Sequence, residues 1–212
     1  MSFYKTCILL ILPWLMSFPL YAVDIDGDGL QDYQVSAGDL HTCSIDDNGV
    51  QCWGYEWADM PTDLVNPVEV SAGKNHTCAL DDSGVHCWGR DDYEKNDVPA
   101  YLVNPVAVSA GGDHTCAIDN SGLHCWGWNR YGQLNVPTYL VNPVTVSANK
   151  FSNHTCAIDD NGVHCWGAKL YGRTDVPSSL VFPVAVSAGY LHTCAIDDNG
   201  VQCWGYSGNG RL

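Results

Sequence analysis

Short runs of alternating apolar and polar residues recur along the chain at nearly even intervals. One unit reads Val106-Ala-Val-Ser-Ala-Gly111, His114-Thr-Cys-Ala-Ile118, Asp119-Asn-Ser-Gly122 and Leu123-His-Cys-Trp-Gly127. Each apolar run is short, rich in β-branched residues and bounded by Gly, Asn or Asp, which indicates strands rather than helices. The pattern predicts an all-β chain built from repeated antiparallel hairpins.

The cysteines follow the same period. Ten of the 11 cysteines form five pairs with eight residues between partners, and the first members lie 35, 38, 40 and 38 residues apart. The pairs are Cys43 and Cys52, Cys78 and Cys87, Cys116 and Cys125, Cys156 and Cys165, and Cys194 and Cys203. Periods near 40 residues are typical of propellers and solenoids. We therefore divide residues 35–212 into five repeats.

The turn between each pair of cysteines sets a hairpin register. In Ile45-Asp-Asp-Asn-Gly-Val50, the Asp, Asn and Gly residues suit a hairpin connection. If Ile45 lies opposite Val50, then Cys43 lies opposite Cys52, with β-carbons roughly 4.5–5.5 Å apart. The register predicts five disulfides, one inside each hairpin, each contributing about 2–3 kcal/mol.

A zinc site is the alternative interpretation of these cysteines. His76 precedes Cys78 by two residues and shares its face of the strand, so His76, Cys78 and Cys87 supply three ligands. No fourth ligand recurs at a fixed place in every unit. The spacing favours disulfides.

Residues 1–22 have the form of a secretory signal peptide. Lys5 precedes an apolar run that ends near Leu20, and Ala22 is a small residue at the expected cleavage position. The run is short for a membrane span, which needs roughly 20 apolar residues. We expect a secreted, periplasmic or cell-surface protein, in a compartment that permits disulfides.

Composition narrows the class of partner. The chain of 212 residues has 9 Lys and Arg against 24 Asp and Glu, a formal net charge of −15. Phosphate binding relies on clustered basic residues, so nucleic acid is not an expected partner. With 46 % hydrophobic residues and 8 tryptophans, the chain has the material for a packed core.

The repeated motifs resemble a known family. Val-Ser-Ala-Gly-x-x-His-Thr-Cys-Ala-Ile, Asp-x-x-Gly-Val-x-Cys-Trp-Gly and Tyr-Gly-Gln-Leu-x-Val-Pro are similar to the regulator-of-chromosome-condensation (RCC-like) repeat, in the cysteine-paired version of exported bacterial proteins. The third repeat keeps the pattern best, and the first two depart from it after Trp-Gly. The resemblance implies a β-propeller with one four-stranded blade per unit. Propellers of this family usually have about seven blades, so five copies imply a small ring or an incomplete one.

The ends of the chain bear on ring closure. The last unit stops at Leu212, before the segment that would enter another blade, and residues 23–34 stand where other units carry that segment. We expect residues 23–34 to complete the last blade and close a five-bladed, monomeric ring. A dimer of open arcs is the alternative.

Residues 23–34 also resemble a calcium-binding loop. Carboxylates at alternating positions and a sharp-turn glycine suit a hard cation, with the candidate ligands Asp24, Asp26, Asp28, Leu30 (carbonyl) and Asp32. The bidentate Glu of an EF-hand is missing. Calcium is the expected cofactor, and a solvated acidic tail is the alternative.

In such a blade, two sets of loops differ in how much they vary between repeats. The hairpin turns and the crossovers are nearly uniform, whereas the loops after Ser-Ala and after Trp-Gly vary. Loops on a rigid scaffold often carry recognition, and Tyr, Trp and Arg often anchor interfaces. The candidate binding residues are Tyr55, Trp57, Arg90, Tyr93, Trp128, Arg130, Tyr131, Tyr171, Tyr190 and Tyr206. Drift in unconstrained loops is the alternative.

Three classes of function follow. We favour a module that binds a protein or a glycan through the variable loops, ahead of a structural envelope or adhesion component. A hydrolase or lyase is the least favoured, because only an isolated pair such as Asp91 and Asp92 offers acid–base chemistry. The repeated Trp-Gly tryptophans and His-Thr-Cys histidines are expected to be structural.

Overall fold

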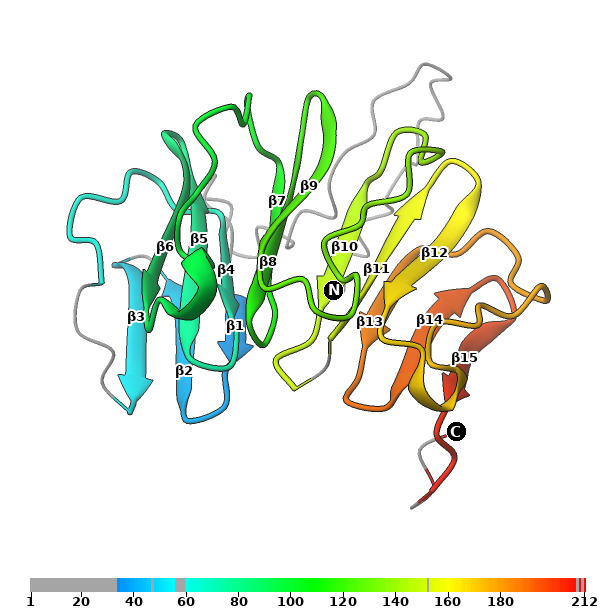
Figure 1. Cartoon of the computed structure of the whole chain (residues 1–212). Coiled ribbons are helices and arrows are strands. Elements are labelled where there is room, and N and C mark those ends of the chain that lie inside the picture. The colour runs from blue at the N-terminus through cyan, green and yellow to red at the C-terminus, as the bar shows by residue number, and fades with distance from the viewer. Residues whose placement is uncertain (1–33, 47, 56–59, 152, 209, 211) are drawn as a thin grey trace, which may run out of the picture.

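Five antiparallel sheets, one for each repeat, stand side by side in an arc (Figure 1). The computed structural model describes residues 34–212, except 47, 56–59, 152, 209 and 211. The first strands of the sheets are β1 (Gln34–Ala37), β4 (Glu69–Ala72), β7 (Ala107–Ala110), β10 (Thr145–Ala148) and β13 (Ala185–Ala188). The second strands are β2 (His41–Asp46), β5 (His76–Asp81), β8 (His114–Asp119), β11 (His154–Asp159) and β14 (His192–Asp197). The third strands are β3 (Gly49–Gly54), β6 (Gly84–Gly89), β9 (Gly122–Gly127), β12 (Gly162–Gly167) and β15 (Gly200–Gly205).

The predicted hairpin register is confirmed. Ile45 pairs with Val50, and the same register holds in all five hairpins. Each hairpin contains a disulfide, with Cα atoms 4.0–4.1 Å apart. The five disulfides join Cys43 to Cys52, Cys78 to Cys87, Cys116 to Cys125, Cys156 to Cys165, and Cys194 to Cys203. All ten cysteines of the repeats are therefore bonded to sulfur, which rules out the zinc alternative for them.

Each hairpin closes on a two-residue turn that needs a glycine. Asp119 pairs with Gly122, whose φ of 128° is a conformation that other residues rarely adopt. One Asp119 carboxylate oxygen accepts hydrogen bonds from Ser121, and the other accepts one from the Val103 amide at 2.8 Å. Burial alone would raise the pKa of Asp119, but these hydrogen bonds lower it to about 2. The turn carboxylate thus fixes both the turn and the crossover, which is a structural role.

The sheets have three strands, not the four that the resemblance implied. The segment after β6 forms a short 3-10 helix η1 (Asp92–Glu94), and its counterpart after β12 is η2 (Leu170–Gly172). The crossover that follows η1 bonds to itself, with Val98 N–H donating to Asn96 and Leu102 N–H to Pro99. Pro99 and Pro105 have no N–H to give to a ladder. Val98 and Leu102 instead pack against the apolar core.

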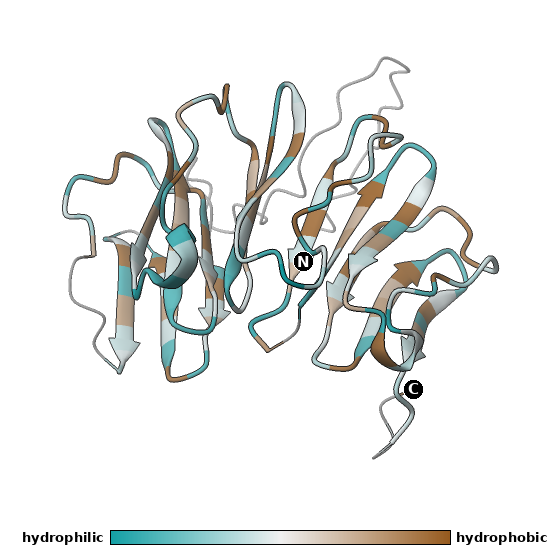
Figure 2. Cartoon of the chain, in the orientation of Figure 1, coloured by the Kyte–Doolittle hydropathy of each residue, from teal (hydrophilic) through white to brown (hydrophobic). Residues whose placement is uncertain are grey.

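The core lies between consecutive blades rather than inside one. Four apolar clusters join blade 1 to 2, 2 to 3, 3 to 4 and 4 to 5. In the second of these, Leu80 and Val85 of blade 2 pack against Val108, Ala110 and Trp126 of blade 3. Apolar residues accordingly band the strands, while the connecting loops are mostly polar (Figure 2). The four in-phase tryptophans that follow Trp53 are buried, as predicted.

The disulfides lie against these clusters. Cys78, Cys116 and Cys156, on the second strands, are completely buried. Their partners on the third strands are partly buried and pack against the same clusters: Cys87, Cys125 and Cys165. Each of these disulfides therefore belongs to the interface with the following blade as well as to its own hairpin.

Polar contacts repeat across the same interfaces. The Ser71 hydroxyl accepts a hydrogen bond from the Ala110 amide at 2.9 Å, and equivalent bonds join each of the other consecutive pairs. His76 Nε2 lies 2.9 Å from Thr115 Oγ1, and this contact also recurs at all four interfaces. The histidines are therefore structural, as the sequence predicted.

The described blades do not form a closed ring. Val35 of blade 1 is 70 % exposed and Val201 of blade 5 is 68 % exposed, so these two blades do not bury each other as consecutive blades do. Residues 23–33, which we expected to complete the last blade, lie outside the described part of the chain, as does the signal peptide.

Candidate functional site

The loops between strands divide the arc into two faces. The first face carries the loops that join the first and second strands and the segments that follow the third strands; we call it the variable face. The opposite face carries the hairpin turns and the ends of the crossovers, and we call it the constant face. The two sets of loops lie along opposite edges of the sheets in Figure 1.

Aromatic side chains from successive blades meet on the variable face. Tyr93 of blade 2 stacks on Trp128 of blade 3, with ring centroids 5.6 Å apart and planes 26° apart. Trp128 in turn meets Tyr131 edge-on at 5.5 Å, and the Arg130 guanidinium lies 6.0 Å from the Tyr131 ring. Tyr93 and Tyr131 remain 57 % and 47 % exposed. We call Tyr93, Trp128 and Tyr131 the aromatic cluster.

Two further aromatic pairs extend along the same face. Tyr171 and Tyr206 lie with ring centroids 4.8 Å apart, and Phe151 and Tyr190 lie 6.4 Å apart. All four side chains are exposed by more than a third. Five of the predicted binding tyrosines are therefore brought into ring contacts between neighbouring loops.

The other predicted residues are less clustered. Tyr55 is an exposed tyrosine on the loop after β3, and Trp57 lies outside the described residues. Arg90 bonds to the Asp92 carboxylate at 2.5 Å, so this cation is partly committed within its own loop. The Asp91 carboxylate accepts the Asn96 amide at 3.0 Å. Asp91 and Asp92 thus organise the loop, and neither is poised against a second free carboxyl group.

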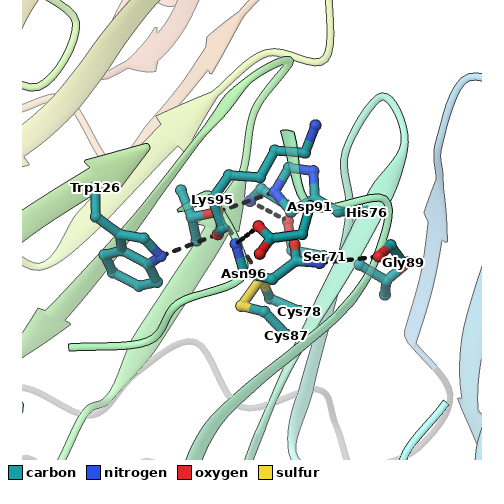
Figure 3. The surroundings of a disulfide bond; sticks show 12 residues. Ser71, His76, Cys78, Cys87, Gly89, Asp91, Lys95, Asn96 and Trp126 are labelled. Atoms are coloured by element: carbon teal, nitrogen blue, oxygen red, sulfur yellow. Dashed lines mark hydrogen bonds between the residues drawn. A yellow bond between two sulfur atoms is a disulfide. The ribbon is translucent and has the colours of Figure 1, made fainter. Parts of the chain in front are cut away.

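A residue that the sequence analysis overlooked fixes the variable loops in place. The backbone carbonyl of Lys95 accepts hydrogen bonds from Trp126 Nε1 and Thr115 Oγ1, both at 2.9 Å (Figure 3). Gln133 and Arg173 occupy the same place in the next two repeats, seven residues after the Trp of Trp-Gly, and their carbonyls accept equivalent bonds. The loop that carries each aromatic side chain is therefore tied to the following blade.

The side chains at this position differ in chemistry, although all are buried. Lys95 extends beside His76 (Figure 3), with its Nζ 3.5 Å from an Asp113 carboxylate oxygen. Arg173 donates to the carbonyls of Ala168 and Tyr190. A fixed spacing from the tryptophan was the only signal in the sequence, since Lys, Gln and Arg share no obvious role.

The histidine–threonine contacts have a definite direction. The Thr115 hydroxyl gives its proton to the Lys95 carbonyl, so it accepts from His114's counterpart in blade 2, His76, whose Nε2 is the donor. Burial, with the positive charge of Lys95, lowers the pKa of His76 to about 3. Burial also lowers the pKa of His114 to about 4 and that of His154 to about 3. These imidazoles are neutral donors at neutral pH.

No group of three metal-ligating side chains is present in the described part of the chain. The candidate calcium ligands Asp24, Asp26, Asp28, Leu30 and Asp32 all lie in residues 1–33, outside that part. Calcium binding stays a prediction from the sequence. No helix within the described residues is long and apolar enough to cross a membrane.

Comparison with known proteins agrees with this architecture. The regulator of chromosome condensation (RCC1) repeat matches residues 68–94, 106–133 and 184–211. The chain carries RCC1 repeats. The second, third and fifth blades contain these matches, and the internal disulfides make them RCC1 repeats of the cysteine-paired version. No curated protein sequence matches significantly.

Solved structures with the RCC1 fold resemble the whole arc. The ectodomain of the receptor kinase CR4 from Physcomitrella patens is 23 % identical with a TM-score of 0.64, and covers 82 % of this chain and 51 % of its own. Prp20p from Saccharomyces cerevisiae is 18 % identical with a TM-score of 0.69, covering 82 % and 58 %. The ectodomain of ACR4 from Arabidopsis thaliana is 25 % identical with a TM-score of 0.66, covering 85 % and 71 %. The chain thus spans between half and three quarters of the length of these relatives.

Proposed function

We propose that this chain is an exported protein-binding module that recognises its partner through the aromatic cluster on the variable face. The observation that carries the proposal is the contact between exposed rings from two different blades, Tyr93 and Trp128, with Tyr131 beside them. Exposed Tyr and Trp side chains held by a rigid scaffold bind partners with little loss of side-chain entropy. Drift in unconstrained loops would not bring these side chains together.

Rigid anchoring supports the same proposal. The Lys95 and Gln133 carbonyls tie the segments on either side of the cluster to tryptophans of the next blades. A preformed surface costs less to order on binding than a mobile loop. The printed title of the Prp20p structure concerns its binding to Gsp1p and histones, which shows that one protein of this fold binds proteins.

Export is supported by two independent features. Residues 1–22 have the pattern of a signal peptide, and each of the five blades holds a disulfide. Binding rather than catalysis is favoured because Asp91 and Asp92 are committed to loop structure.

A quantitative capture experiment tests the proposed surface. The bait is the full mature chain, either wild type or with Tyr93→Ser, Trp128→Ser and Tyr131→Ser, incubated with the extracellular fraction of its host. The control replaces Tyr101 and Tyr139, which are 62 % and 65 % exposed but lie in crossovers. We expect proteins that wild type and control enrich at least tenfold to be lost from the cluster variant.

Two results would contradict the proposal. One is that the cluster variant keeps every partner of the wild type; the other is that nothing is enriched by wild type over a blank support. Repeating the capture after glycosidase treatment of the fraction separates a protein surface from a glycan, since a glycan ligand disappears with the treatment.

The predicted calcium loop has its own test. We expect millimolar calcium to raise the melting temperature of the mature chain, because a ligand that binds the folded state stabilises it by mass action. The shift should disappear in an Asp24→Ala, Asp26→Ala variant. An equal shift in that variant would leave residues 23–34 as a solvated acidic segment.

A further inference from the structure

A cavity of about 1010 Å³ opens on the constant face, away from the aromatic cluster. Its wall includes the starts of four first strands, at Gln34, Glu69, Ala107 and Thr145. The rest of the wall comes from the hairpin turn of blade 2, at 81–84, and from the crossover at 98–106. The sequence analysis expected no binding site here, because these turns and crossovers look alike in every repeat.

Part of the cavity wall is apolar and accessible. Val68, Val106 and Val144 each follow a proline at the end of a crossover, and they are 41 %, 55 % and 53 % exposed. Single exposed valines are ordinary on a protein surface. Three that line one cavity, together with Val98, Leu102 and Val103, form a surface suited to an apolar group.

The charged part of the wall has one sign. Three carboxyl groups line the cavity, those of Glu69, Asp81 and Asp82, and no Lys, Arg or His is among its lining residues. Two of these carboxylates are engaged: Asp81 accepts from the Val65 and Ser83 amides, and Asp82 accepts from the Asn66 side chain. Burial would raise the pKa of Asp81, but its hydrogen bonds lower it below the ordinary value.

Glu69 differs from the other two. Its Oε2 accepts the Val108 amide at 2.9 Å, and no described residue bonds to the other oxygen. Burial raises the pKa of this carboxyl to about 7. A carboxyl group with no cation nearby is costly to ionise, so the site favours whatever supplies a positive charge.

The neighbouring repeat shows that the negative charge is not needed for the fold. Gln34 occupies the same position in blade 1, and its amide oxygen accepts the Val70 amide in the same way. A neutral side chain therefore makes the structural hydrogen bond equally well. The carboxyl group of Glu69 adds only charge, and it adds it beside an accessible apolar wall.

We propose that this cavity binds an amphipathic cation, an ammonium or guanidinium group attached to an apolar chain. Glu69 provides the counter-charge, and Val68, Val106 and Val144 contact the apolar chain. The site is separate from the variable face, so it does not depend on the proposed protein partner.

Calorimetric titration with hexylammonium chloride tests the site. We expect saturable binding to the mature wild-type chain at pH 8, at least tenfold weaker binding to Glu69→Gln, and unchanged binding to Asp82→Asn. Glu69→Gln reproduces the natural arrangement at Gln34, so it should fold. 1-Hexanol, which lacks the charge, should not distinguish wild type from Glu69→Gln.

The same titration has a pH dependence. Hexylammonium stays charged between pH 6 and 8, whereas Glu69 loses its negative charge as the pH falls below about 7. Asp81, with its lowered pKa, stays ionised across this range. Affinity for wild type should therefore fall several-fold from pH 8 to pH 6, and affinity for Glu69→Gln should not. Equal binding to wild type and Glu69→Gln, or no saturable binding to wild type, would overturn the proposal.

Discussion

The same six residues, His-Thr-Cys-Ala-Ile-Asp, form β8 in the middle of the arc and β14 at its end, yet their burial differs. All six are buried in β8, whereas in β14 the burial alternates. Ile118 is 2 % exposed and its counterpart Ile196 is 46 % exposed. Only the neighbouring blade differs, since β14 has no described blade beyond it.

The first blade shows the complementary loss. In β2 the residues that face blade 2 are buried, and those on the other side, such as Thr42 and Ser44, are partly exposed. Trp53 is 55 % exposed, whereas Trp126, at the same position in blade 3, is 8 % exposed. The arc is therefore held together by nearest-neighbour interfaces, as in other repeat proteins, and each blade supplies half of two different surfaces.

Acid should have the largest effect on the interfaces. His76, His114 and His154 have pKa values of about 3 to 4 in the folded state against 6.5 when unfolded, so the unfolded chain binds more protons below pH 6.5. Their stabilising contribution is complete above pH 6.5 and is lost as the pH falls toward 4, by about 1.4 kcal/mol per histidine per pH unit. Denaturant unfolding at pH 7, 6 and 5 measures this slope.

His114→Gln should flatten that slope by about a third. At pH 7, His192→Gln should cost less stability than His114→Gln, because His192 has no described threonine beyond it. An unchanged acid slope in His114→Gln would mean that these histidines do not control the acid response.

Tryptophan truncation should separate middle from end nearly as strongly. Trp126→Ala removes a buried ring that packs against blade 2 and donates to Lys95, so we expect a loss of about 3–5 kcal/mol in unfolding free energy. Trp53→Ala should cost less than about 1 kcal/mol. Similar losses in both variants would show that the outer side of blade 1 is covered in solution.

Disulfide removal should distinguish middle from end only weakly. Replacing Cys116 and Cys125 by alanine, or Cys194 and Cys203, opens a loop of the same length, so each double variant should lose about 2–3 kcal/mol. Thermal melts of the two variants give the comparison. A much larger loss in blade 3 would mean that contacts of the disulfide with the next blade outweigh its effect on its own hairpin.

Polar substitution on the outer side of blade 5 should have the smallest effect. Ile196→Ser is expected to change stability by about 1 kcal/mol or less, whereas Ile158→Ser, at the equivalent buried position in blade 4, should cost several times more. Melting temperatures at one protein concentration compare the pair. If Ile196→Ser is as harmful as Ile158→Ser, a partner surface covers blade 5.

Much of the hairpin architecture could be predicted from the sequence because it depends on local residues. The opposition of Cys43 and Cys52 follows from the turn that separates them, and each turn lies within its own repeat. The structural roles of the Trp-Gly tryptophans and the histidines followed from their recurrence in phase with the apolar pattern.

Features that depend on distant neighbours were not predictable in this way. Ile118 and Ile196 lie in identical hexapeptides, so nothing local distinguishes the buried one from the exposed one. The anchoring position of Lys95 was overlooked because its role rests on a backbone carbonyl, which any side chain leaves available. Crossovers expected to complete each sheet instead bond to themselves around prolines. The candidate site was partly predicted: exposed aromatics were identified, but the contact between Tyr93 and Trp128 requires two blades to be placed side by side.

The hairpin disulfides also bear on how the chain acquires its structure. Every bonded cysteine is joined to the cysteine next to it in the sequence, at a separation of nine residues. Short loops close fastest in an unfolded chain, so the native partner of each thiol is also the one that it meets most often. Oxidation can therefore proceed blade by blade in the order in which the chain emerges, with little need for isomerisation of wrong pairs. The blade interfaces, which need two finished hairpins, can form afterwards.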